Sequence, residues 1–555
     1  MSLSRSFLLA AFAALGLLVH GLAAADPTTV CTITVNSADE REVMRRYLPP
    51  DRYRFVELVE RGRPDWLASA CRKDIRCDVL VISGHFDGGD EFYSDRVDAR
   101  ESLPVAEMER VSCGGSCGLF SRLKEVYLFG CNTLNPDSLH AAPDELARSL
   151  VAAGHAPAAA MQLAQALSAR YADSNRDRMR AIFKDVPLIY GFSSKAPLGA
   201  RAGPLLARYL QSGEGPPVGS GQPSDKLLAL FAPASMTTAS GVRDGDASSG
   251  YRHDLCQFVD ERVSKAQRIA FVHSLLGRDM AEARLFLDPI EHALDALSAA
   301  DRASAPVARA LAEIDADHAA RERYVGYLRN LGDAELRTRM IEIGARLGWL
   351  SDAQRVAELT RMIGDRLQAV DLGARDVDVV CRLEASHALQ GVGAIATSTA
   401  DDTVARSAIR ACLGDAGAHR ALLHALTGAG EADVGIVQVY LRHHPIVAAA
   451  ELRSIAHRIA GMRDARAQAR ALDTLADNRV SDVESLEALA RLFPAARSIG
   501  VQRAIAAVLI RSDYQAIANP ELVQALREKR LKSPDGKDLI DILIRRMQAS
   551  LGKAA

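Results

Sequence analysis

Short apolar runs alternate with amphipathic stretches through the first 213 residues of the chain. Runs rich in β-branched and large apolar residues predict strands, and apolar residues every three or four positions predict helices. Strands are expected at residues 30–35, 53–59, 78–82, 126–129 and 186–190, with helices at 39–47, 64–72, 105–110, 144–153 and 158–183. Strict alternation is typical of a mostly parallel sheet covered by helices on both faces. Residues 26–213 are therefore predicted to form a three-layer α/β domain.

The pattern changes after residue 213. Residues 214–250 are rich in Gly, Pro and Ser and predict a linker or flexible loop with one short helix at 227–231. Beyond residue 255 the chain shows amphipathic helices and no strand pattern, so residues 251–400 are predicted to form a helical domain.

The last part of the chain, residues 401–555, looks internally repetitive. Similar apolar-faced segments recur every 30 to 34 residues, at 404–413, 434–443, 467–476 and 501–510. Helix pairs at this period stack into solenoids, because one pair alone cannot bury its apolar face. The segment resembles HEAT-like helical repeats, and the alternative is an irregular helical bundle.

The amino terminus has the three parts of a secretory signal. Arg5 precedes an apolar run at residues 7–18, and small residues lead up to Asp26. An uncleaved anchor is the alternative, but the run is shorter than the roughly 20 residues of a spanning helix. We therefore expect residues 1–25 to be a signal peptide, and the mature protein to be periplasmic or secreted without a membrane span.

Composition narrows the chemistry further. The 555 residues carry a formal net charge of only −2, which gives no electrostatic argument for nucleic acid or for an anionic membrane. Nine cysteines in an exported protein permit disulfides and leave at least one thiol free, for which Cys131 is the candidate. The close pairs Cys71 with Cys77 and Cys113 with Cys117 could form local disulfides, and zinc binding is the alternative for the second pair.

Two residues that could do chemistry follow predicted strands. His85 comes directly after the strand at 78–82 and Cys131 after the strand at 126–129, 46 residues later. Ligand sites of open α/β sheets lie beyond the carboxyl ends of the strands. His85 and Cys131 are therefore expected to meet there as a base and a nucleophile.

These strand ends are similar to those of the clan CD cysteine peptidases, which include caspases, metacaspases, gingipains, separases and bacterial CHAT domains. The sequences concerned are Ile82-Ser-Gly-His85 and Leu128-Phe-Gly-Cys131-Asn-Thr. The resemblance covers residues 28–212 and implies a caspase-like fold in which a His85/Cys131 dyad hydrolyses peptide bonds. It also implies an oxyanion hole formed by the backbone N–H groups of Cys131 and Phe86. The family usually has Gly where this chain has Phe86. The backbone geometry there is expected to differ, because Gly adopts φ values that Phe resists.

The same resemblance suggests where a substrate would bind. The predicted strand at 186–190 and the following loop resemble the caspase element whose edge pairs with the substrate backbone, so Tyr190, Ser193 and Ser194 are candidates. An ordinary edge strand is the alternative. Asp87 and Asp90 belong to an acidic stretch after His85 that could bind a basic substrate side chain, hold calcium or form a solvated loop.

Together these features predict an exported cysteine endopeptidase-like protein with no cofactor other than this possible calcium ion. Its substrate would be a peptide or protein, and its helical repeats would bind a protein partner or the substrate. The alternative is a catalytically inactive caspase-like scaffold that serves as a protein-interaction module.

Overall fold

The structure is a computed structural model of the chain. It describes residues 26–61, 65–86, 89–94, 101–137, 143–152, 154–170, 174–389, 403–428, 430–534 and 538–554. The predicted signal peptide lies outside these residues. The chain divides into two compact units, residues 1–316 and 317–555. The division falls inside residues 251–400, which the sequence pattern assigned to one helical domain.

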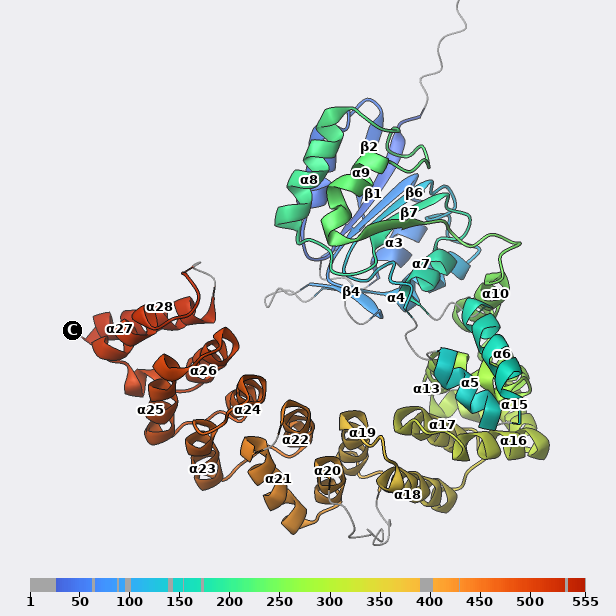
Figure 1. Ribbon diagram of the computed structural model, residues 1–555. Coiled ribbons are helices and arrows are strands. Elements are labelled where there is room, and N and C mark those ends of the chain that lie inside the picture. Colours follow the sequence, from blue (N-terminus) through green and yellow to red (C-terminus); the bar gives the residue numbers. More distant parts are fainter. Residues whose placement is uncertain are drawn as a thin grey trace, which may run out of the picture. The chain divides into compact units, whose positions relative to one another are not determined.

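The first unit contains a six-stranded sheet in the order β2-β1-β3-β6-β7-β8 (Figure 1). Its first five strands are mutually parallel, as predicted, and β8 runs antiparallel to β7. A separate hairpin pairs β4 with β5. The strands are β1 (Thr28–Thr34), β2 (Tyr53–Glu57), β3 (Val79–Ser83), β4 (Glu91–Tyr93), β5 (Ser102–Pro104), β6 (Glu125–Phe129), β7 (Leu188–Phe192) and β8 (Met236–Ala239).

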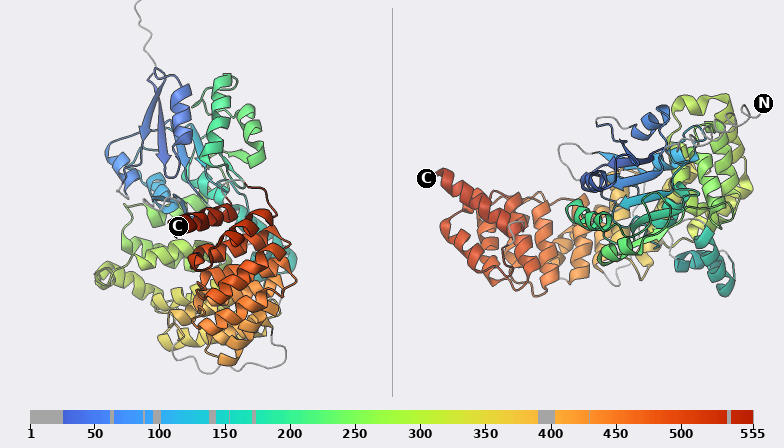
Figure 2. Two further views of the ribbon diagram at one scale, coloured as in Figure 1. Left: turned by 90° about the vertical axis from the view of Figure 1, so that its left-hand side faces the viewer. Right: turned by 90° about the horizontal axis from the view of Figure 1, so that it is seen from above.

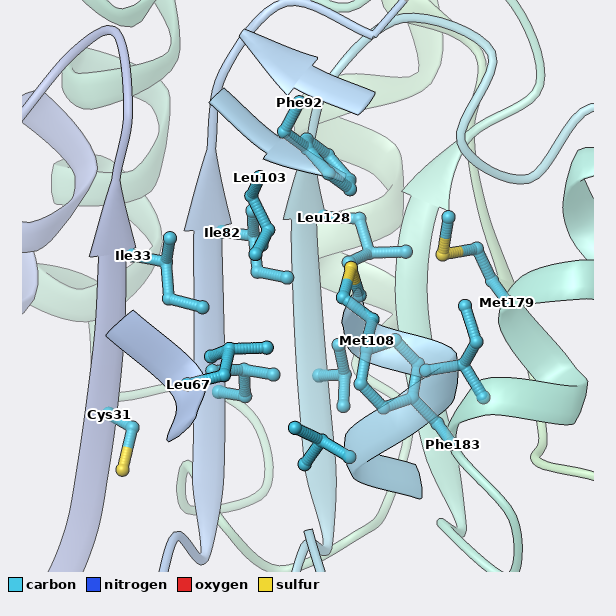
Figure 3. Close-up of a cluster of buried hydrophobic side chains, with 14 of the residues drawn as sticks. Cys31, Ile33, Leu67, Ile82, Phe92, Leu103, Met108, Leu128, Met179 and Phe183 are labelled. Carbon is cyan, nitrogen blue, oxygen red and sulfur yellow. The ribbon is translucent and has the colours of Figure 1, made fainter. Parts of the chain in front are cut away.

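Side chains alternate between the two faces along each strand, so apolar residues lie on both faces. Helices cover both faces of this sheet and bury these residues. Ile82 and Leu128 belong to a buried cluster with Leu67 of α3, Met108 of α4 and Met179 of α7 (Figure 3). The intervening strand residues pack with side chains of α2, α8 and α9 on the opposite face. These helices are α2 (Asp39–Tyr47), α3 (Trp66–Arg72), α4 (Val105–Cys113), α7 (Asn175–Ile182), α8 (Gly199–Ser212) and α9 (Asp225–Phe231).

The structure does not support a linker at residues 214–250. Leu227 and Phe231 of α9 are fully buried against the sheet, and β8 pairs with β7 from Ile189 opposite Ala239 to Phe192 opposite Met236. The Gly- and Pro-rich composition instead supplies the turns between short packed elements.

The remaining helices of the first unit lie before and after this segment. Helices α5 and α6 pack on each other, and α10 packs on α4 and α13. The helices are α5 (Pro143–Ala152), α6 (Pro157–Arg170), α10 (Ser249–Val259), α11 (Lys265–Leu276), α12 (Met280–Ala283), α13 (Leu287–Asp295), α14 (Ala299–Ala303) and α15 (Ala305–Asp315).

Four disulfides cross-link the chain and leave Cys131 as the free cysteine, as predicted. The expected local pairs are wrong. The pairs are Cys31–Cys77, Cys71–Cys117, Cys113–Cys256 and Cys381–Cys412. The zinc interpretation of Cys113 and Cys117 fails too, because both sulfurs are in disulfides. The fold brings together cysteines that are far apart in sequence, which spacing alone does not reveal.

The second unit consists of helices. Helices α22, α24 and α26 begin at Glu431, Ala465 and Ile499, and so repeat every 34 residues. They pack successively in one row from α20 to α28, while α21, α23 and α25 form a second row (Figures 1 and 2). The helices are α16 (His318–Arg329), α17 (Ala334–Arg346), α18 (Asp352–Gln368), α19 (Ala374–Ala385), α20 (Val404–Cys412), α21 (Ala416–Gly428), α22 (Glu431–His443), α23 (Ala449–Ile459), α24 (Ala465–Asp477), α25 (Val483–Leu492), α26 (Ile499–Arg511), α27 (Pro520–Glu528) and α28 (Leu539–Ala554).

Within the described part of the chain, no helix has both the length and the apolar character needed to cross a membrane.

Candidate active site

The ends of two neighbouring strands bring His85 and Cys131 to one place. Strands β3 and β6 are parallel, with Ser83 opposite Phe129, and the amide of Gly84 donates to the Phe129 carbonyl at 3.1 Å. His85 and Cys131 each follow this paired position by two residues, so they leave the sheet at the same level. Both line one shallow cleft that is open to solvent.

Segments from five places in the chain form the walls of this cleft. Besides the ends of β3 and β6, they are Asn36 and Ser37 after β1, Glu40 at the start of α2, and residues 196–199, which lead into the first residue of α8. Gly199 is needed at this meeting point, because a Cβ there would lie 2.1 Å from Ser37 Oγ. The cleft therefore lies at the carboxyl edge of the sheet, where α/β folds commonly bind ligands.

The turn that carries Cys131 is tied to the neighbouring strand. Asn132 adopts a left-handed conformation with φ of 59°, and its amide donates to the Ser194 carbonyl at 2.8 Å. The buried Thr133 hydroxyl donates to the Gly130 carbonyl at 3.2 Å and accepts from the Phe192 amide at 3.1 Å. These bonds fix the direction of the partly exposed Cys131 side chain.

Gly130 allows the two strand ends to approach closely. A Cβ at this position would lie 2.9 Å from Phe86 Cβ and 3.0 Å from the Gly84 carbonyl oxygen. The absence of a side chain at Gly130 thus lets the residue before the candidate nucleophile pack against the chain that carries His85.

His85 is held by the β4 hairpin. Its amide donates to the Tyr93 carbonyl and its carbonyl accepts from the Tyr93 amide, both at 2.9 Å. The two rings lie 5.4 Å apart between centroids. The acidic stretch after His85 is therefore partly a strand, and is not simply the solvated loop that was one of its interpretations.

Phe86 is a core residue. Its side chain is fully buried and packs on Phe92 with 4.5 Å between ring centroids. Among the described residues, no hydrogen bond engages the amides of Phe86 or Cys131. Neither N–H group therefore has an acceptor among the described residues, and the Phe86 ring packs under the β4 hairpin.

Asp90 does not line the cleft. It is exposed and pairs with Arg178 at 3.5 Å, and the Arg178 guanidinium also donates to the Gly89 carbonyl and to buried Glu109. This network anchors the segment after His85 to α7 and α4, which explains the acidic side chain without a ligand. Asp87 lies outside the described residues.

Tyr190 does not line the cleft either. Its side chain is buried, stacks on Tyr127, and its hydroxyl accepts from the Ser224 amide at 2.8 Å. It points to the face of the sheet that α8 and α9 cover, because strand positions alternate between faces. The expectation of a free edge at β7 is wrong as well, since β8 occupies it.

Ser193 and Ser194 continue beyond β7 without lining the cleft. The Ser193 amide donates to the Ser235 carbonyl at 3.1 Å, and the Ser194 carbonyl accepts from Asn132. Ser194 therefore helps to position the turn that carries Cys131, whereas Ser193 is bonded to the residue before β8. The cleft wall on this side begins two residues later, at Ala196.

Sequence reasoning missed Glu40. This side chain is 2% exposed, lines the cleft and accepts a hydrogen bond from Ser83 Oγ at 3.0 Å. Burial raises the pKa of Glu40 to about 7, against the smaller opposing effects of its hydrogen bonds. The available signal was its place just after the first strand, but an acid in the first turn of a helix is usually solvated.

A second cluster of ligand-type side chains lies in the helical unit. The ligand atoms of Cys381, Cys412 and His444 are within 4.8 Å of one another. The two cysteines form a disulfide, so their sulfurs are occupied by each other.

Comparison of the chain with protein-family models, with curated proteins and with solved structures found no match.

Proposed function

We propose that this protein is an exported cysteine endopeptidase, similar to the clan CD peptidases, that hydrolyses peptide bonds with His85 and Cys131. The observation that carries the proposal is the placement of these two side chains. They follow in-register parallel strands, line one cleft, and include the only cysteine among the described residues that is not in a disulfide.

The arrangement fits a two-step acyl transfer. The Cys131 sulfur attacks the scissile carbonyl carbon, and His85 takes the thiol proton and delivers it to the leaving amine. Water then attacks the thioester and releases the acid, which restores the thiol. The amides of Cys131 and Phe86 would stabilise the negative charge on the carbonyl oxygen.

Export is supported by the disulfides. Four such bonds are typical of an extracellular or periplasmic compartment and rare in a reducing cytosol. The successive helices of the second unit supply an extended surface of the kind that repeat proteins use to bind other proteins. We assign the binding of a protein partner or substrate to this unit.

The test is labelling of the purified mature protein with a cysteine-directed peptide probe, followed by identification of the modified residue. We expect modification at Cys131 alone, none in Cys131→Ser, and at least tenfold slower modification in His85→Ala. Labelling that is equally fast without His85 would contradict the catalytic proposal. It would favour the inactive scaffold, in which Phe86 and its surroundings replace an active geometry.

A further inference from the structure

The cleft beside Cys131 contains a buried carboxylate. Among the described residues that line it, Glu40 is the only acid, and no lysine or arginine lines it. The remaining titratable groups of the lining are His85 and Cys131. Glu40 is therefore the one carboxylate that the described lining places beside the candidate catalytic pair.

Glu40 differs from other buried carboxylates of the described chain. Glu109 pairs with Arg178, Glu358 with Arg329, and Asp376 with Arg366. Glu125 has no such cation, but its carboxylate accepts from the Tyr127 hydroxyl and the Gly221 amide. Within the described residues Glu40 forms no ion pair, and Ser83 is the side chain that donates to it.

A buried acid without a cation is costly, and the structure shows how this cost is met. The raised pKa lets Glu40 stay partly protonated near pH 7, and exposed Asp39 next to it adds to this effect. A cation that entered the cleft would hold the carboxylate in its charged form. Groups of this kind, buried in a cleft and short of a partner, are characteristic of binding sites.

The position of Glu40 suits a long side chain. Its carboxylate is bonded to Ser83, which lies one strand across from Phe129 and two residues before the level of Cys131. Ser83 is therefore separated from the level of Cys131 by about 4.8 Å across the sheet and roughly 6.6 Å along the strands. Ala196 and Leu198 line the same cleft and offer apolar contacts, and Leu198 is 64% exposed. Lysine and arginine combine such an apolar stem with a charged end.

We propose that Glu40 determines specificity, by binding the lysine or arginine side chain of the residue immediately before the scissile bond. This inference rests on the proposed peptidase function. An acidic side chain at that position would be repelled by the carboxylate, and a neutral one would gain no charge-assisted hydrogen bond.

The first experiment compares peptide substrates that differ only before the scissile bond, with arginine, lysine, glutamate or citrulline, the neutral analogue of arginine. We expect the wild type to favour arginine over citrulline by roughly 10- to 150-fold in kcat/KM, the effect of a hydrogen bond to a charged group. Glu40→Gln should remove this preference, so that the arginine and citrulline peptides have similar kcat/KM values. A preference for glutamate, or an arginine preference that survives Glu40→Gln, would overturn the inference.

Glu42→Gln is the matched control. It removes one negative charge from the same helix, but Glu42 is exposed and pairs with Arg41 outside the cleft lining. We expect it to leave the preference intact. Glu40→Gln should fold, because its neutral side chain resembles protonated Glu40, and thermal unfolding verifies this.

A binding measurement separates this inference from the proposed function. Fluorescent product-like peptides ending in arginine or citrulline are titrated into Cys131→Ala and into Cys131→Ala with Glu40→Gln. Tighter binding of the arginine peptide that depends on Glu40 supports the pocket even if Cys131 proves unreactive in the wild type. Equal binding of both peptides overturns the pocket, and His85-dependent labelling of Cys131 would still support the peptidase.

Discussion

The cleft of the α/β unit and the helical unit use their polar residues in opposite ways. In the helical unit, charged side chains pair with one another across neighbouring helices. Arg366 bonds Asp376 at 2.7 Å and Arg503 bonds Asp538 at 2.8 Å. In the cleft, Glu40 is buried without a cation and the amides of Phe86 and Cys131 keep their donors, as far as the described residues show. Paired charges stabilise a fold, whereas groups left to be completed by a ligand serve binding and chemistry.

The two regions also differ in what holds them. Backbone and side-chain hydrogen bonds between strand ends fix the cleft, and the Thr133 hydroxyl bonds both the Gly130 carbonyl and the Phe192 amide. Packing of successive helices holds the second unit, with one disulfide between α19 and α20. The predictions below test whether these regions depend on such different interactions.

The largest expected effect on stability comes from removing the disulfide of the helical unit, which should leave the cleft of the first unit unaffected. Replacing both Cys381 and Cys412 by Ser opens a loop of 31 residues and should lower the unfolding free energy by about 3–4 kcal/mol. Labelling of Cys131 should remain unchanged, because the disulfide belongs to the helical unit. Urea unfolding and probe labelling measure the two effects. The matched control is the double Ser variant of Cys71 and Cys117, in the first unit. Loss of labelling after removal of the Cys381–Cys412 bond would show that the comparison is wrong.

Glu40 should make stability depend on pH. Burial raises its pKa from an ordinary 4.5 to about 7 in the folded protein, so the folded state binds the proton more tightly. Stability contributed by this group is complete below pH 4.5, falls as pH rises from 4.5 to 7, and then stays constant. The loss amounts to about 3 kcal/mol. Urea unfolding of Glu40→Gln, compared with wild type across this range, should lack this component. Parallel pH profiles of the two proteins would refute the burial argument.

Gly130→Ala tests the close approach of the strand ends. The added Cβ would lie within 3.0 Å of Phe86 and Gly84, and should destabilise the protein by about 1–3 kcal/mol and slow labelling of Cys131. Gly250→Ala is the control, because nothing lies within 4 Å of its Cβ position. Thermal unfolding of both variants measures the difference, and equal stability would mean that Gly130 is not required.

The smallest effect is expected for Thr133→Val. This change keeps the shape but removes the hydroxyl that joins Gly130 to Phe192, at a cost of about 1–2 kcal/mol. Thr133→Ser keeps the hydroxyl and should retain the labelling rate of Cys131. If Thr133→Val reacts as fast as Thr133→Ser, the turn is held by other contacts.

The parts that the sequence predicted are those with strong local patterns. The apolar runs at 126–129 and 78–82 became β6 and β3, and the alternation of strands and helices predicted that the strands run mostly parallel. Strand β8 was missed because only Met236 of its four residues is buried, and its Thr residues follow a Gly- and Pro-rich segment. Edge strands of this kind acquire their conformation from the neighbouring strand.

The site was predictable only as far as strand ends determine it. His85 and Cys131 followed from position, but whether a side chain enters the cleft depends on contacts between distant segments. Glu40 is buried by the strand that carries Ser83, 43 residues away, and Tyr190 is turned from the cleft by the alternation within β7. The place of Glu40 after the first strand is a weak signal by itself, and the local sequence does not show which face of β7 lies away from the cleft.

The most direct test of the account is the rate at which iodoacetamide, an uncharged reagent that needs no substrate pocket, alkylates Cys131 at pH 7. If His85 activates the Cys131 thiol, the wild type should react at least ten times faster than His85→Ala, with both proteins folded to the same stability. Equal rates would contradict the claim that these two strand-end residues act together.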